Sequence, residues 1–141
     1  MKDAAIIDTL QAGHLFLAIA DASENLLEVS FVCERAAGVN NAHRGVEFRR
    51  CGSGSLIDIY LEVETSEGFA YCWWITVRFD ASGWSVLATV SKTENAEQRI
   101  IQELCEFKGS EVHLFLLKMK EACRLVVESA SSFEFKKRAT V

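Results

Sequence analysis

The stretch YCWWITVRF, from Tyr71 to Phe79, decides the fold of this chain. Its odd-numbered positions are aromatic or branched apolar residues, whereas most of its even-numbered positions are small, polar or charged. This period of two predicts a β-strand with one face in the core. Because neighbouring side chains of a strand point to opposite sides, we expect Trp73 to enter the core and Trp74 to lie on the second face.

Two similar stretches flank this strand, LIDIYLEVE (56–64) and WSVLATVSK (84–92). Both alternate between apolar and polar residues, and short loops that contain glycine join them to the first stretch. A slip of one residue would exchange the two faces, so the loop lengths fix the pairing. A three-residue loop at 66–68 sets Tyr60 opposite Trp74, and a four-residue loop at 80–83 sets Phe79 opposite Trp84. These hairpins predict an antiparallel meander.

Two more strands are predicted before the meander. ENLLEVSFVCE (24–34) alternates over residues 27–33, and VEFRRC (46–51) does so over a shorter length. AAGVNNAHRG (36–45) is rich in turn residues and is predicted to be a loop. A turn at GSGS (52–55) would set Phe48 opposite Ile59 and Arg49 opposite Asp58.

Helical spacing of apolar residues appears at both ends of the chain. It predicts a helix over about 3–20, a second over TENAEQRIIQELCEF (93–107), and a third that follows a cap at Ser110. We therefore expect residues 1–141 to form one α+β domain. It would have an N-terminal helix, a five-stranded, mainly antiparallel meander sheet, and two C-terminal helices packed on one face. The basic tail, about 133–141, is expected to fray.

Composition narrows the classes of function. The 141 residues carry a net charge of -5, which disfavours nucleic acid as a partner and suits a basic protein. No apolar run is long enough to span a bilayer, and the N-terminus lacks the pattern of a signal peptide. Five cysteines without a CxxC pair are then best explained as reduced thiols in a cytoplasmic protein that binds no membrane.

No motif for catalysis, cofactor binding or metal binding emerges. The three histidines lack metal-ligand spacing, and no serine lies in a nucleophile elbow. Cys51 follows His43 in the sequence, but nothing brings the thiol and the imidazole together. GSGS joins two strands, so it cannot cradle a phosphate at a helix N-terminus. We therefore expect a non-enzymatic protein.

The second face of the predicted sheet is the best candidate for a partner-binding surface. Trp74 and Tyr60 would form its centre, and charged residues of the same two strands would surround them. Interface hot spots are enriched in tryptophan, tyrosine and arginine. The candidate partner-binding residues are Asp58, Tyr60, Glu62, Glu64, Trp74 and Arg78. An alternative is that the N-terminal helix covers this face, in which case Trp74 belongs to the core.

The chain resembles the small cytosolic immunity proteins of bacterial polymorphic-toxin and contact-dependent growth inhibition systems, most clearly in the stretch CWWITVRFDASGWSVLATV (72–90). The resemblance covers roughly residues 57–90. The resemblance implies an inhibitory binding protein without a cofactor, which neutralises a cognate toxin domain, often a basic nuclease, by covering its active surface. A small acidic secretion chaperone, acting as a homodimer on an effector segment, is the alternative. In that case Phe16 and Ile19 of the first helix could form the dimer contact.

Overall fold

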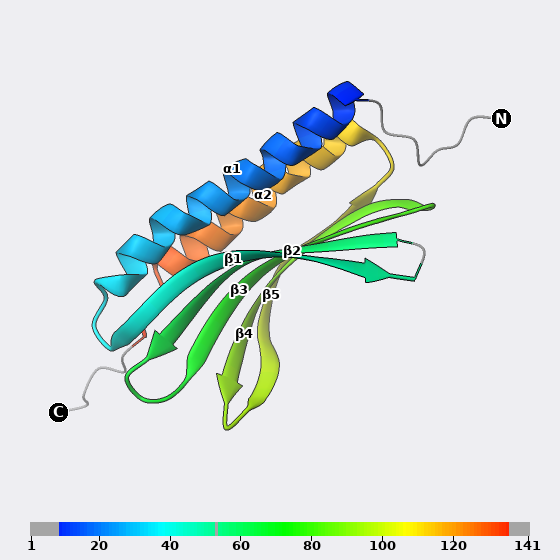
Figure 1. The fold of residues 1–141 in the computed structure, drawn as a ribbon. Coiled ribbons are helices and arrows are strands. Elements are labelled where there is room, and N and C mark those ends of the chain that lie inside the picture. The colour runs from blue at the N-terminus through cyan, green and yellow to red at the C-terminus, as the bar shows by residue number, and fades with distance from the viewer. Residues whose placement is uncertain (1–8, 53, 136–141) are drawn as a thin grey trace.

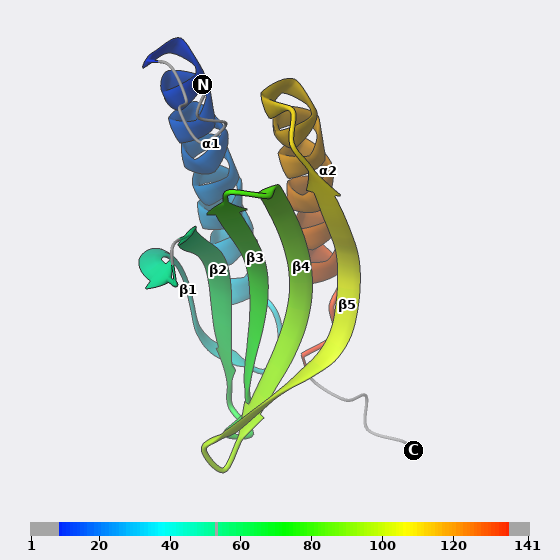
Figure 2. The ribbon, with the colours of Figure 1, turned by 90° about the vertical axis from the view of Figure 1, so that its right-hand side faces the viewer.

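The computed structural model describes residues 9–52 and 54–135, except for the side chains of residues 9–11 and 51. The elements are α1 (Thr9–Glu34), β1 (Val39–Cys51), β2 (Gly54–Thr65), β3 (Ala70–Asp80), β4 (Gly83–Glu94), β5 (Glu97–Gly109) and α2 (Val112–Ser131). The strands form one antiparallel sheet in the order β1-β2-β3-β4-β5. Both helices pack on the same face of this sheet (Figures 1 and 2). Neither of them combines the length and the apolar character that crossing a bilayer requires.

The meander of β2, β3 and β4 confirms the prediction at its centre. Tyr60 pairs with Trp74 and Phe79 pairs with Trp84, as the loop lengths require. Trp73 faces the helices with no exposed surface, and its indole Nε1 donates a hydrogen bond to the Ser129 Oγ of α2 at 2.9 Å. The core therefore lies between the sheet and the helices, and Trp73 connects the two layers.

The predicted strand over 27–33 is wrong, because these residues form the second half of α1. The buried side chains of this half follow helical spacing and include Leu26, Val29 and Cys33. Phe31 is apolar but 50% exposed, and it produced the false alternation in the sequence.

The predicted helix over 93–107 is also wrong, because it covers the β4–β5 turn and most of the edge strand β5. The pairing of β5 with β4 shifts between Ala88 and Thr89 and again between Val90 and Ser91. Each shift is a β-bulge, which adds a residue to one strand and disrupts its alternation. A single C-terminal helix therefore follows the sheet, and its N-cap is Glu111 rather than Ser110.

β1 is longer than predicted and begins at Val39, inside the predicted loop. Its turn to β2 is tighter than the expected four residues, because Cys51 already pairs with Gly54. Phe48 consequently pairs with Ile57 instead of Ile59. This shift of two positions leaves every side chain on its predicted face.

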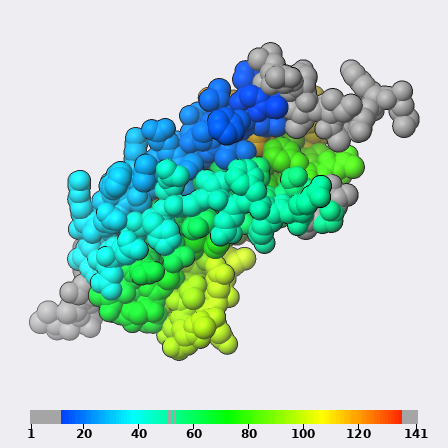
Figure 3. All heavy atoms as spheres, viewed as in Figure 1, coloured from blue at the N-terminus to red at the C-terminus, as the bar shows by residue number. Residues whose placement is uncertain are grey.

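The segment after α2 remains packed as far as the structure describes it. The Phe133 ring lies 5.2 Å from the Trp73 ring, and Phe135 is buried. The predicted fraying of the tail is therefore wrong for 133–135, and residues 136–141 lie outside the described residues. Figure 3 shows the β4–β5 hairpin, in yellow-green, projecting from the body of the molecule.

Candidate partner-binding face

The sheet face opposite the helices, called the outer face below, carries the predicted partner-binding residues. Because α1 and α2 both lie on the other side, the alternative in which the N-terminal helix covers this face is wrong for the described part of the chain. Trp74 is half-buried and belongs to this face. The register places all six predicted residues on it, namely Asp58, Tyr60, Glu62, Glu64, Trp74 and Arg78.

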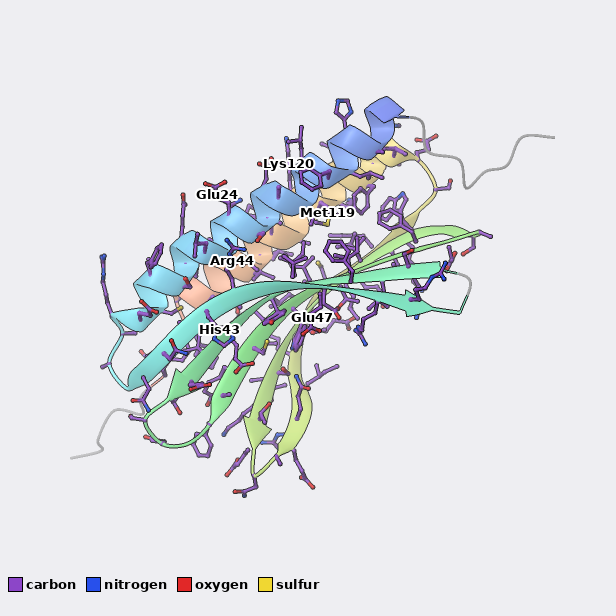
Figure 4. The ribbon with its side chains drawn as sticks, in the orientation of Figure 1. Glu24, His43, Arg44, Glu47, Met119 and Lys120 are labelled. Atoms are coloured by element: carbon purple, nitrogen blue, oxygen red, sulfur yellow. The ribbon has the colours of Figure 1, made fainter. Side chains whose placement is uncertain are left out.

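An aromatic pair forms the centre of the outer face. The rings of Tyr60 and Trp74 lie 5.1 Å apart between centroids and are tilted by 38°. His43 of β1 meets the Tyr60 ring edge-on, with centroids 6.3 Å apart. Figure 4 shows His43 and Glu47 on this side of β1 and Arg44 on the helix side. Aromatic pairs in this distance range stabilise a protein beyond the area they bury.

Gly45 allows Tyr60 to lie across β1. A Cβ atom at this position would come within 2.8 Å of Cε1 of the Tyr60 ring, and closer still to Cζ and the hydroxyl oxygen. Gly45 does not have a positive φ, so its backbone conformation would accept other residues. The glycine is therefore required for space, and it sets where the tyrosine ring lies.

The Trp74 indole is held by hydrogen bonds on the β4 side. Its Nε1 donates to Ser91 Oγ at 3.0 Å, and Gln98 Nε2 of β5 donates to the same oxygen at 2.9 Å. The Ser91 hydroxyl is directed at the carbonyl oxygen of Cys72, 3.5 Å away. Ser91, which accepts both bonds, is 1% exposed, whereas Gln98 is exposed. The indole is therefore preorganised, which lowers the entropy lost on binding.

Carboxylates give the aromatic pair a negative surrounding. The pKa of the Tyr60 hydroxyl is raised, first by burial and then by the charges of Glu47, Cys72 and Glu62. Glu64 is exposed further along β2, and Arg78 is exposed on β3. The surroundings of the aromatic centre therefore favour a cationic group on a partner.

Asp58 lies on the predicted face, but it is only 2% exposed. Its carboxylate forms an ion pair with the Arg49 guanidinium and accepts a hydrogen bond from Thr76 Oγ1 at 2.7 Å. Asp58 therefore holds Arg49 in place and does not itself offer a free carboxylate to a partner. The prediction that Arg49 lies opposite Asp58 is wrong, because Arg49 pairs with Leu56, but the two side chains still meet diagonally on the same face.

The thiols of the described residues are poor nucleophiles at neutral pH. Burial raises the pKa of the Cys33 thiol to about 11, and burial together with neighbouring carboxylates raises that of Cys72 further. Cys51 and His43 are eight residues apart on the same extended strand, which is about 26 Å at 3.3 Å per residue. Among the described residues, no group of three or more histidine, cysteine, aspartate or glutamate side chains could hold a metal ion.

Three residues near the aromatic pair were not among the predicted site residues, namely His43, Gly45 and Glu47, although Glu47 lies in the predicted strand over 46–51. They belong to the first half and middle of β1, where Ala42 and Val46 are the alternating inward-facing positions. The charged Arg44 lies between these two and conceals the period. The one sequence signal that could have extended the predicted strand back to His43 is the strict alternation of apolar residues at the odd positions of the neighbouring strands.

Compared with known proteins, the chain matches no family model, no curated protein and no solved structure.

Proposed function

We propose that this chain is a non-enzymatic inhibitory binding protein whose outer face covers the active surface of a basic, folded toxin domain. The observation that carries the proposal is the half-buried Tyr60–Trp74 pair on a sheet face that no described helix covers. The class of partner and the cytosolic location are those that the resemblance of residues 72–90 to cytosolic immunity proteins implies. Covering an active surface needs no catalytic group on the inhibitor.

The make-up of the outer face supports binding to protein. A few aromatic and arginine residues dominate most interface energies, and their truncation costs about 2 kcal/mol or more at a hot spot. Trp74 is fixed by Ser91, and Tyr60 is fixed by its position over Gly45, so neither side chain needs to be ordered on binding. Little of the free energy gained by contact with the partner would then be lost in ordering these two side chains, so most of it would contribute to the affinity.

Charge supports a basic partner. Arg49 neutralises Asp58, which leaves Glu47, Glu62 and Glu64 as the acids around the aromatic pair on β1 and β2. Complementary charge raises the association rate, an effect that salt weakens. A nuclease surface that binds phosphate presents the required basic groups.

The experiment uses the purified chain and a catalytically inactive form of the toxin domain encoded beside its gene. Calorimetry should give a dissociation constant that rises about 30-fold, equivalent to about 2 kcal/mol, in Trp74→Ala. Phe48→Ala is the control, because it removes a 71% exposed aromatic side chain from the other side of the same sheet and should leave affinity unchanged. Equal affinity of Trp74→Ala and the unaltered chain, with both folded, would refute the proposal.

A second candidate function is supported by apolar side chains exposed on the helices. Phe16 is 71% exposed, Leu17 56% and Leu117 58%. Such residues suit the alternative of a small acidic secretion chaperone that acts as a homodimer on an effector segment. A chaperone would bind an extended, unfolded segment, whereas an inhibitor would bind a folded domain and abolish its toxicity. Binding to the same domain in its folded and its denatured form separates the two.

A further inference from the structure

The two helices form a groove on the side of the molecule away from the sheet. They run parallel, because Asn25 Nδ2 lies 3.6 Å from Cys123 Sγ and Cys33 Sγ lies 3.8 Å from the carbonyl oxygen of Ala130. The groove between them has a volume of about 780 Å³. Its buried floor includes Met119, and its two walls come from different helices.

The walls of the groove carry opposite charges. On α1 the acids Asp21, Glu24 and Glu28 line it, and on α2 the bases Lys120 and Arg124 do. Figure 4 shows Glu24 and Lys120 projecting on the side away from the sheet. The groove acids and Lys120 form no ion pair with any described residue.

Each wall continues into an exposed leucine. Leu17 precedes the acids of α1 by four, seven and eleven residues, and Leu117 precedes the bases of α2 by three and seven. These intervals place each leucine on the same helix face as its charges. Both leucines are more than half exposed. The helix layer thus presents two parallel stripes of the same pattern, apolar and then charged, with opposite signs.

Arg124 is partly neutralised within its own helix. Its guanidinium binds Glu121 at 2.6 Å and Glu128 at 2.7 Å, and neither glutamate lines the groove. These bonds hold the guanidinium in a fixed orientation beside the groove. Lys120 is the unpaired base of the wall, so it is the position where a charge change acts most directly.

We propose that two copies of this chain associate through their helix layers, about a twofold axis parallel to the helices. This axis lays α1 of one copy along α2 of the other in the same direction, so that acids face bases twice in the dimer. The other twofold axis in the plane of contact would lay α1 on α1 and face acids with acids. Charge therefore selects a single symmetric arrangement of four helices.

The levels of the residues along the helices agree with this arrangement. Because Asn25 is level with Cys123, Glu24 is level with residue 122, midway between the partner's Lys120 and the partner's Arg124. Leu17 is level with residue 115, about 3 Å along the axis from the partner's Leu117 at 1.5 Å per residue. The same twofold axis thus brings opposite charges together and also brings the exposed leucines of the two copies close to each other.

The dimer does not depend on the proposed function. The helix layer and the outer face lie on opposite sides of the sheet, so each copy would keep its outer face free. A variant that cannot dimerise should still bind a basic domain through Trp74. Failure of one proposal therefore leaves the other testable.

The test measures the mass of the full chain by sedimentation over a range of concentrations. The unaltered chain should dimerise, and Glu24→Lys and Lys120→Glu should each raise the dimer dissociation constant more than about tenfold, since each change puts two like-charge contacts in the dimer. An equimolar mixture of the two variants should dimerise again as a heterodimer. The chain carrying both changes should recover the homodimer.

The control is Glu103→Lys, which makes the same charge change as Glu24→Lys on exposed strand β5, and it should not alter the dissociation constant. Circular dichroism of every variant should show the unaltered helix content. Three results would overturn the proposal: a chain that is monomeric at its highest soluble concentration, a dimer that Glu24→Lys and Lys120→Glu leave unchanged, or a mixture no better associated than each variant alone.

Discussion

Replacing Gly45 with alanine tests the arrangement of the outer face. An added methyl group would approach Cε1 of Tyr60 to 2.8 Å, whereas carbon atoms normally approach to about 3.5–4.0 Å. The tyrosine ring must therefore shift by about 1 Å or swing away from β1. Either movement disturbs its contact with Trp74, whose ring centroid is 5.1 Å away.

Two opposing effects determine the change in stability. Alanine in place of glycine in regular backbone stabilises a protein by about 0.5–1 kcal/mol, because the unfolded chain loses freedom. Overfilling a packed site costs about 1–3 kcal/mol, including the contacts that are lost. We therefore expect Gly45→Ala to lower the free energy of unfolding by about 0.5–2 kcal/mol.

Urea denaturation measures this change, with Gly13→Ala as the matched control. Gly13 lies in α1, and apart from the neighbouring backbone of its own helix nothing lies within 4 Å of its added Cβ, so this variant should gain about 0.5–1 kcal/mol. In a Tyr60→Ala background the ring is absent, and Gly45→Ala should then become stabilising as well. A gain in Gly45→Ala as large as in Gly13→Ala while Tyr60 is present would refute the placement of the ring.

Three further predictions follow from burial and charge. Trp74 is the half-buried tryptophan beside two that are 0% and 6% exposed, so caesium should quench its fluorescence more than iodide does, and Trp74→Phe should remove most of the quenching. Asp58→Ala should lower the free energy of unfolding in urea by about 1–3 kcal/mol because it removes the buried carboxylate that binds half-buried Thr76 and exposed Arg49, whereas Glu62→Ala should change it by less than about 0.5 kcal/mol. The pKa of the Cys33 thiol is about 11 in the folded chain, above the ordinary thiol value of 9.0 that applies to the unfolded chain. The unfolded chain therefore loses this proton at lower pH, and the free energy of unfolding should fall as pH rises from 9 to 11. Cys33→Ala should make that fall shallower in denaturation curves recorded across this range.

The centre of the sheet could be predicted because its physical constraints are redundant. In β2, β3 and β4 the alternation, the glycine turns and the loop lengths all require the same register. One face is buried along the whole length, so a wrong register would expose several apolar side chains at once. The predicted neighbours of Trp74 followed from these constraints alone.

The two long misassigned segments lack that redundancy. In α1, Phe31 and Val32 are apolar and exposed, so apolar residues no longer mark one face and a false period of two appears beside the helical one. In β5 the opposite error arises, because two bulges lengthen the spacing of its apolar residues toward that of a helix. The spacing of apolar residues is misleading where such residues are exposed or where a strand lies at the edge of a sheet. In those segments the secondary structure is determined by packing against the neighbouring element.

The same irregular features explain why we expect association through the faces of the sheet and not through its edges. β5 ends the sheet with two bulges and with exposed charges such as Arg99 and Glu103, all of which oppose the addition of a strand. β1 ends it on the other side with Arg44 directed toward the helix layer, and a charge pointing inward at an edge has the same effect. With both edges protected, two surfaces remain for partners: the outer face, centred on aromatic rings, and the helix layer, with its stripes of opposite charge. The first is acidic and suits a different, basic molecule, whereas the second is complementary to itself and suits another copy of the chain.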